Sequence, residues 1–316
     1  MRLLNTLMAG LLLAVTPLHA AEPASTAMAG ESVLTLRVDG ELTIGTEGQV
    51  LSYTLRSKVD QNLQNLLAKA IPQWRLVPMQ QGGKPVNATS PMRITLVAKQ
   101  VPAGYEVRVD NVIFRALSKA DIAAERAAME RARATGEVVT QAGEAPHAPT
   151  FIDSVRAKPP GYPVGLMKAG VEGLVLLNLR LNPDGTVAEV VATQSSLFDI
   201  KGRPEVLDKA RGLLEKESMR AAKTWTFKVD ANKAAQLTSE DLTVRVPVEF
   251  VMRTDRSHDV EMSEKWRQEF RGPNLPAPWL KRATQEVGAS DLAGGEQVAG
   301  AATFQLRDRS VLNQVL

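Results

Sequence analysis

Hydrophobic and polar residues alternate in two stretches of the chain, and a helical pattern follows each one. In the first stretch the alternation covers residues 33–38 and 50–55, with Thr46, Glu47 and Gly48 forming a turn between them. A period of two is typical of strands with one buried face, so a β-hairpin is predicted. A helix ending near Pro72 is predicted next, because apolar residues then recur at helical spacing. They are Val59, Leu63, Leu66, Leu67 and Ala70.

The rest of the first stretch and the second stretch yield further strands and a long helix. Strands are predicted at 93–99, 106–114, 174–181, 187–193 and 243–251. Asn182, Pro183, Asp184 and Gly185 form a turn signal, because proline presets φ and glycine accepts a positive φ. A helix is predicted over residues 205–223, where apolar residues recur at helical spacing.

The two stretches have the same order of elements, which indicates an internal repeat. Each consists of a hairpin with a glycine turn, a helix, a tryptophan two residues before Leu76 or Phe227, a polar loop and a final strand. The glycines are Gly48 and Gly185, and the tryptophans are Trp74 and Trp225. We therefore predict two related domains, at residues 32–115 and 158–252, that arose by divergent duplication.

The segments outside the two domains have a different composition. Residues 116–157 are predicted to be a helical and flexible linker, because 117–134 are rich in Ala, Arg and Glu and the following residues contain several Gly and Pro. Residues 253–316 form a polar tail that we expect to be partly disordered. Apolar periodicity returns at residues 303–316, so docking of this last segment onto the fold is the alternative.

Residues 1–20 have the layout of a secretory signal peptide. Arg2 precedes a short apolar run, Pro17 breaks it, and the small residues Ala20 and Ala21 follow. We expect cleavage there and a periplasmic location. The alternative is that the segment stays uncleaved and anchors the protein in the inner membrane, facing the periplasm. Cysteine is absent, so each domain must be stable without disulfides.

Charge and motifs argue against several functions. The net charge is +3, but the 38 basic and 35 acidic residues are interspersed, so nucleic-acid binding is not expected. The three histidines, His19, His147 and His258, have no metal-ligand spacing, and no nucleophile motif or phosphate loop is present. We therefore predict that the protein is not an enzyme, with no catalytic residues, metal, cofactor or small-molecule substrate.

Four motifs of the second domain, in order and spacing, resemble the C-terminal domain of TonB-type energy transducers. They are Tyr162-Pro163, the stretch 170–175, the turn 182–185, and Trp225-Thr226-Phe227. The first domain resembles a divergent copy of the same family. This resemblance implies an α+β fold of two TonB C-terminal-like domains. Each would be a small antiparallel sheet with helices packed on one face.

The residues of these motifs have expected structural roles. Pro163 is favourable in the first turn of a helix, and Gly173 would let that helix pass into the next strand. Trp225 would anchor the long helix over the sheet, and Trp74 marks the equivalent helix exit. Gly48 and Gly185 would form the hairpin turns.

The resemblance also implies a binding mode. TonB domains bind outer-membrane transporters by adding the transporter's extended segment to an exposed sheet edge. The strand that this implies here is residues 243–250. Pro247 removes one amide donor from it, so a protected, non-binding edge is the alternative. The residues that the resemblance assigns to partner binding are Lys158, Tyr162, Val244, Arg245, Val246, Val248 and Phe250.

We therefore expect a periplasmic TonB-like protein that binds an outer-membrane transporter or another periplasmic protein. The alternative is a membrane-anchored transducer that couples the inner-membrane proton-motive complex to outer-membrane transporters. The chain has no recognisable long Pro-rich spacer of the kind that this family uses to cross the periplasm.

Overall fold

The computed structural model describes residues 30–114, 152–229, 237–239, 241–252, 265–280, 288–291, 298–299 and 304–316. The predicted signal peptide (1–20), the helix predicted at 117–134 and all three histidines lie outside the described residues. The fold is α+β, and every strand pairing among the described residues is antiparallel.

The first half of the described chain, residues 30–114, contains one helix and six strands. Its elements are β1 (Glu31–Ile44), β2 (Val50–Leu55), α1 (Gln61–Ala70), η1 (Ile71–Gln73), β3 (Met79–Gln81), β4 (Lys84–Val86), β5 (Ala88–Val101) and β6 (Gly104–Phe114). The predicted hairpin, helix and two later strands are confirmed. The small hairpin β3–β4 lies where only a turn was expected, at residues 81–85.

The second half, residues 152–252, contains the long helix and a short one. Its elements are β7 (Ile152–Arg156), α3 (Val164–Lys168), β8 (Glu172–Leu181), β9 (Val187–Phe198), α4 (Pro204–Ala222), β10 (Thr226–Val229) and β11 (Thr243–Phe250). The predicted strands at 174–181, 187–193 and 243–251 and the helix at 205–223 are confirmed. β7 lies within residues 116–157, for which a linker was expected.

The region expected to be a polar tail contributes four further elements. They are β12 (Arg267–Arg271), η2 (Ala289–Asp291), β13 (Val298–Ala299) and η3 (Arg309–Val311). β12 is the most consequential, because it pairs with residues 31–35 of β1 on one side and with residues 196–198 of β9 on the other. The two halves were expected to have separate small sheets. β12 instead joins them into one nine-stranded sheet, in the order β13-β11-β8-β9-β12-β1-β5-β6, with β2 beside β1.

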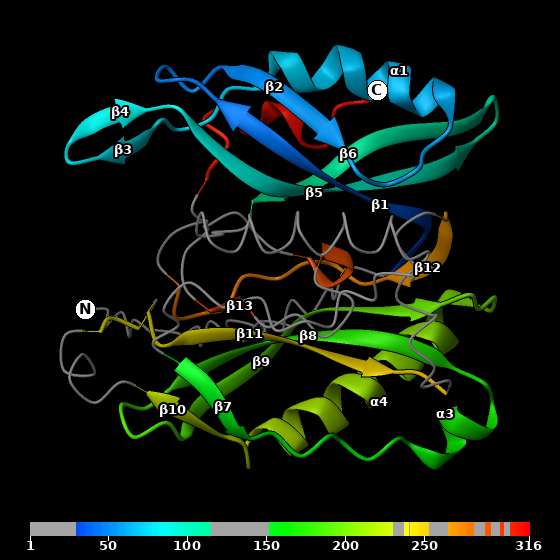
Figure 1. Ribbon diagram of the computed structural model, residues 1–316. Helices are drawn as coiled ribbons and strands as arrows, with labels where there is room; N and C mark the ends of the chain where they lie inside the picture. Colours follow the sequence, from blue (N-terminus) through cyan, green and yellow to red (C-terminus); the bar gives the residue numbers. More distant parts are fainter. Residues whose placement is uncertain are drawn as a thin grey trace, which may run out of the picture.

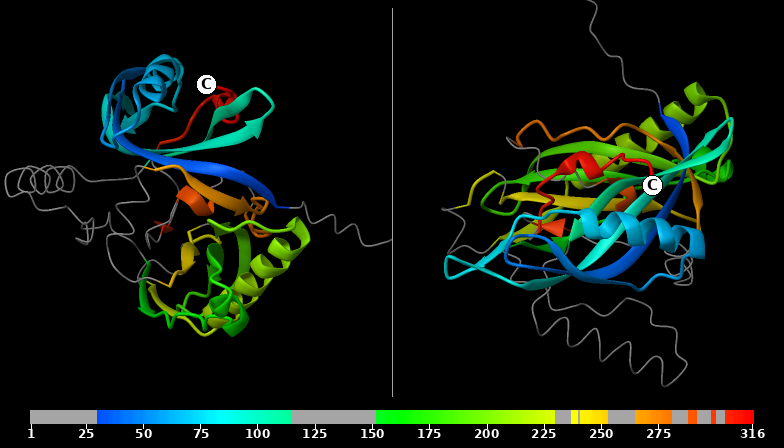
Figure 2. Two further views of the ribbon diagram at one scale, coloured as in Figure 1. Left: turned by 90° about the vertical axis from the view of Figure 1, so that its right-hand side faces the viewer. Right: turned by 90° about the horizontal axis from the view of Figure 1, so that it is seen from above.

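The two helices α1 and α4 lie on opposite outer sides of the molecule, and β12 lies between the two halves (Figure 1). The left view in Figure 2 shows the same layering from the side. Each half has its own hydrophobic core between its helix and its part of the sheet. The core of the first half is centred on Trp74, Leu67 and Ile94, and that of the second on Trp225, Leu214 and Leu177.

The two halves repeat the same local geometry. In each half the first strand of the hairpin pairs with the second and with the long strand that follows the helix: β1 with β2 and β5, and β8 with β9 and β11. The amide of Leu76 donates to the carbonyl of Gly48, and the amide of Phe227 donates to the carbonyl of Gly185, both at 2.8 Å. The turn of each hairpin is therefore fastened to the residue two positions after the buried tryptophan.

Candidate functional site

The predicted docking strand is β11, and it lies next to the end of the sheet. On its inner side it pairs with β8 along its whole length. On its outer side it pairs with β13 only at Val244 and Arg245. Within the described part of the chain, no strand pairs with the outer side of residues 246–250.

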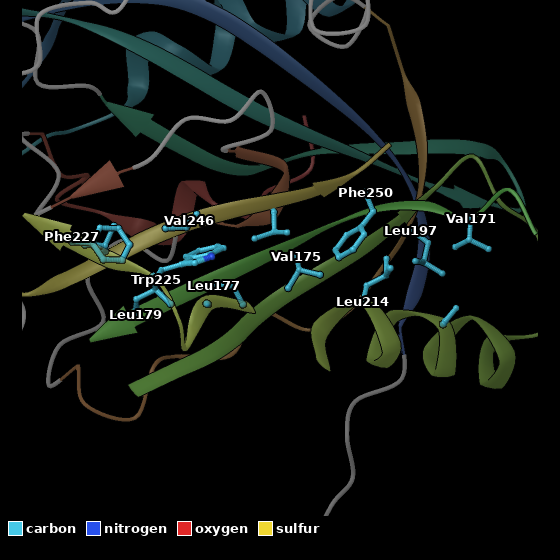
Figure 3. Close-up of a cluster of buried hydrophobic side chains, with 14 of the residues drawn as sticks. Val171, Val175, Leu177, Leu179, Leu197, Leu214, Trp225, Phe227, Val246 and Phe250 are labelled. Carbon is cyan, nitrogen blue, oxygen red and sulfur yellow. The ribbon is translucent and has the colours of Figure 1, made fainter. Parts of the chain in front are cut away.

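Most side chains assigned to partner binding on β11 point into the core of the second half. Val244, Val246, Val248 and Phe250 are buried there together with Trp225 and Leu214. Figure 3 shows Val246 and Phe250 among these core side chains. These four side chains therefore stabilise the domain and are not available to a partner. Arg245 lies on the other face of the strand and is partly buried, and burial lowers its pKa.

The register of β11 with β8 determines which main-chain groups of β11 face outward. In an antiparallel pair the amides of successive residues point alternately to the two neighbouring strands. Pro247 is opposite Leu176 of β8 and has no amide hydrogen. The amide of Leu181 donates to the carbonyl of Leu242 at 2.9 Å, so in this register Val246 and Val248 form hydrogen-bonded pairs with β8. The amides of Arg245 and Glu249 therefore point to the outer edge.

Tyr162 packs against the second core, whereas Lys158 is exposed and is joined to that core through its main-chain carbonyl. The Tyr162 hydroxyl donates to the carbonyl of Val171 at 2.5 Å, and its ring packs edge-on against Phe250 at 5.3 Å between centroids. Burial, followed by the nearby charge of Glu172, raises the pKa of Tyr162. The carbonyl of Lys158 accepts a hydrogen bond from the indole nitrogen of Trp225 at 2.8 Å.

Two of the expected structural roles are changed by the structure. Pro163 is the residue that precedes α3, rather than a member of its first turn. Gly173 lies inside β8, where a Cβ atom would meet the carbonyl oxygen of Ser196 at 2.5 Å. It is therefore required by close packing. Gly170 makes the passage from α3 to β8, with a φ of 70°.

Gly48 and Gly185 do form the hairpin turns. Both their backbone conformation and the lack of space for a side chain require glycine there. Their φ angles are 80° and 85°. A Cβ atom would lie 1.9 Å from the carbonyl oxygen of Leu76 in one case and 1.8 Å from that of Phe227 in the other. Trp74 and Trp225 are both buried, each in the core of its own half.

Sequence reasoning missed a polar middle layer between the two halves. Arg271 of β12 forms an ion pair with Asp110 of β6 at 2.6 Å, and Arg93 pairs with Asp39 at 2.7 Å. The guanidinium carbon of Arg267 lies 3.3 Å from the centre of the Phe198 ring. These charges alternate with apolar residues along their strands, a pattern that is typical of a solvent-exposed face. In the structure the charged face of each half is covered by the other half.

Asp291 of η2 is the most buried acid in this layer, with 1% of its surface exposed. It accepts hydrogen bonds from the Thr95 hydroxyl, the side-chain amide of Asn111 at 2.5 Å, and the amide of Gly288 at 2.6 Å. Gln194 of β9 accepts from the amide of the neighbouring Ala289 at 2.7 Å. Residues 288–291 therefore tie the two halves together. Burial raises the pKa of Asp291 despite its hydrogen bonds.

The described residues contain no group of three or more His, Asp or Glu side chains placed to hold a metal ion. Among the helices that the structure describes, none is long and apolar enough to cross a membrane. No protein-family model matches the sequence, and no curated protein or solved structure matches the chain.

Proposed function

We propose that this protein is a periplasmic TonB-like module that binds an outer-membrane transporter or another periplasmic protein by β-strand addition. In this proposal an extended segment of the partner pairs with the outer edge of β11, within TonB-related transport. The protein acts by binding and does not catalyse a reaction.

The position of β11 carries the proposal. The strand described beside it reaches only Val244 and Arg245, so the outer main-chain groups of residues 246–250 face no described strand. Strand addition uses such groups, and each main-chain hydrogen bond contributes about 0.5–1.5 kcal/mol. The burial of the β11 valine side chains means that affinity would come from the main chain. Selectivity would then depend on residues of the opposite face, such as Arg245 and Glu249.

The fold already pairs short extended segments of its own chain at other edges, which supports this binding mode. β7 pairs with β10 in the second half. In the first half, Leu306 pairs with Leu76 and Val315 pairs with Arg108 of β6. Edges of both halves therefore accept short extended segments through main-chain contacts.

Two substitutions that change the outward amide donors of β11 would test the proposal. Glu249→Pro removes one outward donor, and Pro247→Val adds one, while the amides of Val246 and Val248 remain for β8. The probe is a synthetic peptide with the sequence of a transporter's extended segment. We expect Glu249→Pro to weaken its binding about two- to tenfold and Pro247→Val to strengthen it, as one hydrogen bond predicts.

Unfolding midpoints of both variants should be measured first, so that a loss of fold is recognised. A matched control is Lys223→Ala, which changes a residue that follows α4 and leaves β11 intact. Unchanged peptide binding by both folded β11 variants, or no binding by the parent protein, would contradict docking on this edge.

The proposed location rests on residues 1–20. Amino-terminal sequencing of the protein purified from cell fractions tests it. Cleavage after Ala20 or Ala21 in periplasmic material supports a free periplasmic protein. An intact Met1 in the membrane fraction would support the anchored transducer instead.

A further inference from the structure

Residues 304–316, the C-terminal segment, lie against the first half although they are far from it in sequence. The Leu306 main chain pairs antiparallel with Leu76. The amide of Val77 donates to the carbonyl of Gln305 at 2.8 Å, and the amide of Arg307 donates to that of Arg75 at 2.7 Å. Residues 75–77 are therefore an acceptor edge that an extended segment fills.

Side chains of the C-terminal segment alternate between buried and exposed as they pass this edge. Phe304 and Leu306 are buried in the core of the first half, whereas Gln305 and Arg307 are exposed. The Phe304 ring lies 5.9 Å from that of Phe114, between centroids. The edge thus recognises an aromatic residue followed two positions later by a leucine, because these two side chains fill the core.

The same segment then covers the free edge of β6. The amide of Asn313 donates to the carbonyl of Val109 at 2.7 Å, and that of Leu316 donates to Val107 at 2.9 Å. Val315 lies opposite Arg108. Leu312 and Leu316 are only partly buried against the core. This second contact is therefore made mainly by the main chain.

The second half has an acceptor edge at the equivalent place, and a different segment fills it. Phe227, which corresponds to Leu76 in the repeat, pairs antiparallel with Ser154 of β7. β7 precedes the repeated elements of its half, whereas the C-terminal segment follows them all. Two segments with unrelated sequences and opposite positions in the chain thus occupy corresponding edges. Each edge thus binds the main chain of a strand, and the side chains that enter its own core set the sequence that it prefers.

We propose that residues 75–77 and the outer edge of β6 form a second peptide-binding site, which the C-terminal segment occupies within the same molecule. A partner protein with an extended segment of aromatic-x-leucine sequence would bind there by displacing residues 304–316. The C-terminal segment is thereby an internal competitor that keeps the site closed. This site lies in the first half, so the inference does not depend on docking at β11.

The test uses a fluorescent synthetic peptide of residues 303–316 and two proteins, the full chain and a chain that ends at residue 303. We expect the peptide to bind the shortened protein and to bind the full chain at least tenfold more weakly, because there the site is filled. A control peptide with Phe304→Asp and Leu306→Asp should lose binding to the shortened protein.

Circular dichroism establishes whether the shortened chain is folded. If it is not, the full chain with Phe304→Ala and Leu306→Ala replaces it, since this variant keeps the segment but weakens its side-chain contacts. The peptide should bind this variant more tightly than the parent protein.

Several outcomes would overturn the inference. They are absence of peptide binding to both altered proteins, equal binding to the parent and the altered proteins, and equal binding of the control peptide. Glu249→Pro in β11 should leave capture of this peptide unchanged. Loss of peptide binding at residues 75–77 and β6 can thereby be distinguished from loss of peptide binding at β11.

Discussion

The amide nitrogen of Phe227 lies 2.8 Å from the carbonyl oxygen of Gly185, and this hydrogen bond fastens the β8–β9 turn to the strand that follows the long helix. The same bond occurs between Leu76 and Gly48 in the first half. In both cases the glycine has a positive φ, and its missing side chain leaves the space that the approaching main chain occupies. The pair of contacts is the clearest structural mark of the internal repeat.

Gly185→Ala should destabilise the protein by more than the backbone strain alone. A non-glycine residue in the left-handed region costs roughly 1–2 kcal/mol. The new Cβ would also collide with the Phe227 carbonyl, so the turn and β10 must separate. The free energy of unfolding in urea measures the loss.

Gly170→Ala is the matched control for Gly185→Ala. Gly170 also has a positive φ, but nothing lies within 4 Å of a Cβ atom built there. The Gly170→Ala variant should therefore lose only the stability that the backbone strain costs. In the first half, Gly48→Ala should behave like Gly185→Ala, and Gly83→Ala is its control. Gly83 has a positive φ, and nothing lies within 4 Å of a Cβ atom built there. Equal losses at Gly185 and Gly170 would show that the close approach has no energetic importance.

Breaking the ion pair between Arg271 and Asp110 should weaken the junction between β12 and the first half. Arg271 is desolvated, yet the adjacent Asp110 carboxylate raises its pKa above the ordinary value. Asp110→Asn removes the nearer of the two carboxylates that pair with the buried guanidinium of Arg271 and leaves Glu31 at 3.6 Å, so we expect it to lower the free energy of unfolding by about 1.5–3 kcal/mol. Urea denaturation measures this change.

Glu189→Gln provides the comparison for Asp110→Asn. Glu189 pairs with Arg180, and the side chains of both are about a third or more exposed. Exposed ion pairs contribute about 0–1 kcal/mol, so this substitution should have little effect. A loss at Glu189 as large as that at Asp110 would be inconsistent with a special role for the middle layer.

Asp291 should make stability depend on pH. Burial raises its pKa in the folded protein, so the folded state binds this proton more tightly than the unfolded state does. The free energy of unfolding should therefore fall as the pH rises from about 3.9, the unfolded value, through the raised folded pKa. Asp291→Asn should remove this decline, which urea denaturation at successive pH values would detect.

Asp241 is a control of opposite sign. Hydrogen bonds from Thr238 lower its pKa, so its contribution is present above the unfolded value and is lost as the pH falls. Asp241→Asn should therefore lower the free energy of unfolding at neutral pH. The fall in this free energy with rising pH that Asp291 causes should remain. If Asp291→Asn and the parent protein show parallel pH curves, the buried carboxyl does not titrate in the way described.

Much of the fold could be predicted from local pattern, because the elements of each half are long and have one clearly apolar face. The hairpin glycines, the helices and the two tryptophans were identifiable for this reason. β12 was not, because Arg267, Glu269 and Arg271 alternate with only one large apolar residue, Phe270, and resemble an exposed segment. Its burial depends on partners outside the strand, such as Ser290, which bonds to Glu269, and the distant Asp110, which bonds to Arg271.

The position of β11 near the edge of the sheet was predicted, but the direction of its side chains was not. Alternation in β11 puts Val246 and Val248 on an apolar face, which by itself favours the core. The family resemblance assigned these two residues to a partner instead, and the second core holds them. The acceptor edge beside Trp74 had no local signal, since its occupant comes from the distant Leu306.

The pairing of Leu76 with Leu306 has a consequence for biosynthesis. Residues 30–114 leave the ribosome early, but their core contains Phe304 and Leu306, which belong to the last described segment of the chain. Contacts between such distant residues form slowly, and apolar surface stays exposed until they do. For a long interval the earliest part of the nascent chain is therefore vulnerable to aggregation and to proteases. During that interval it is a natural substrate for chaperones.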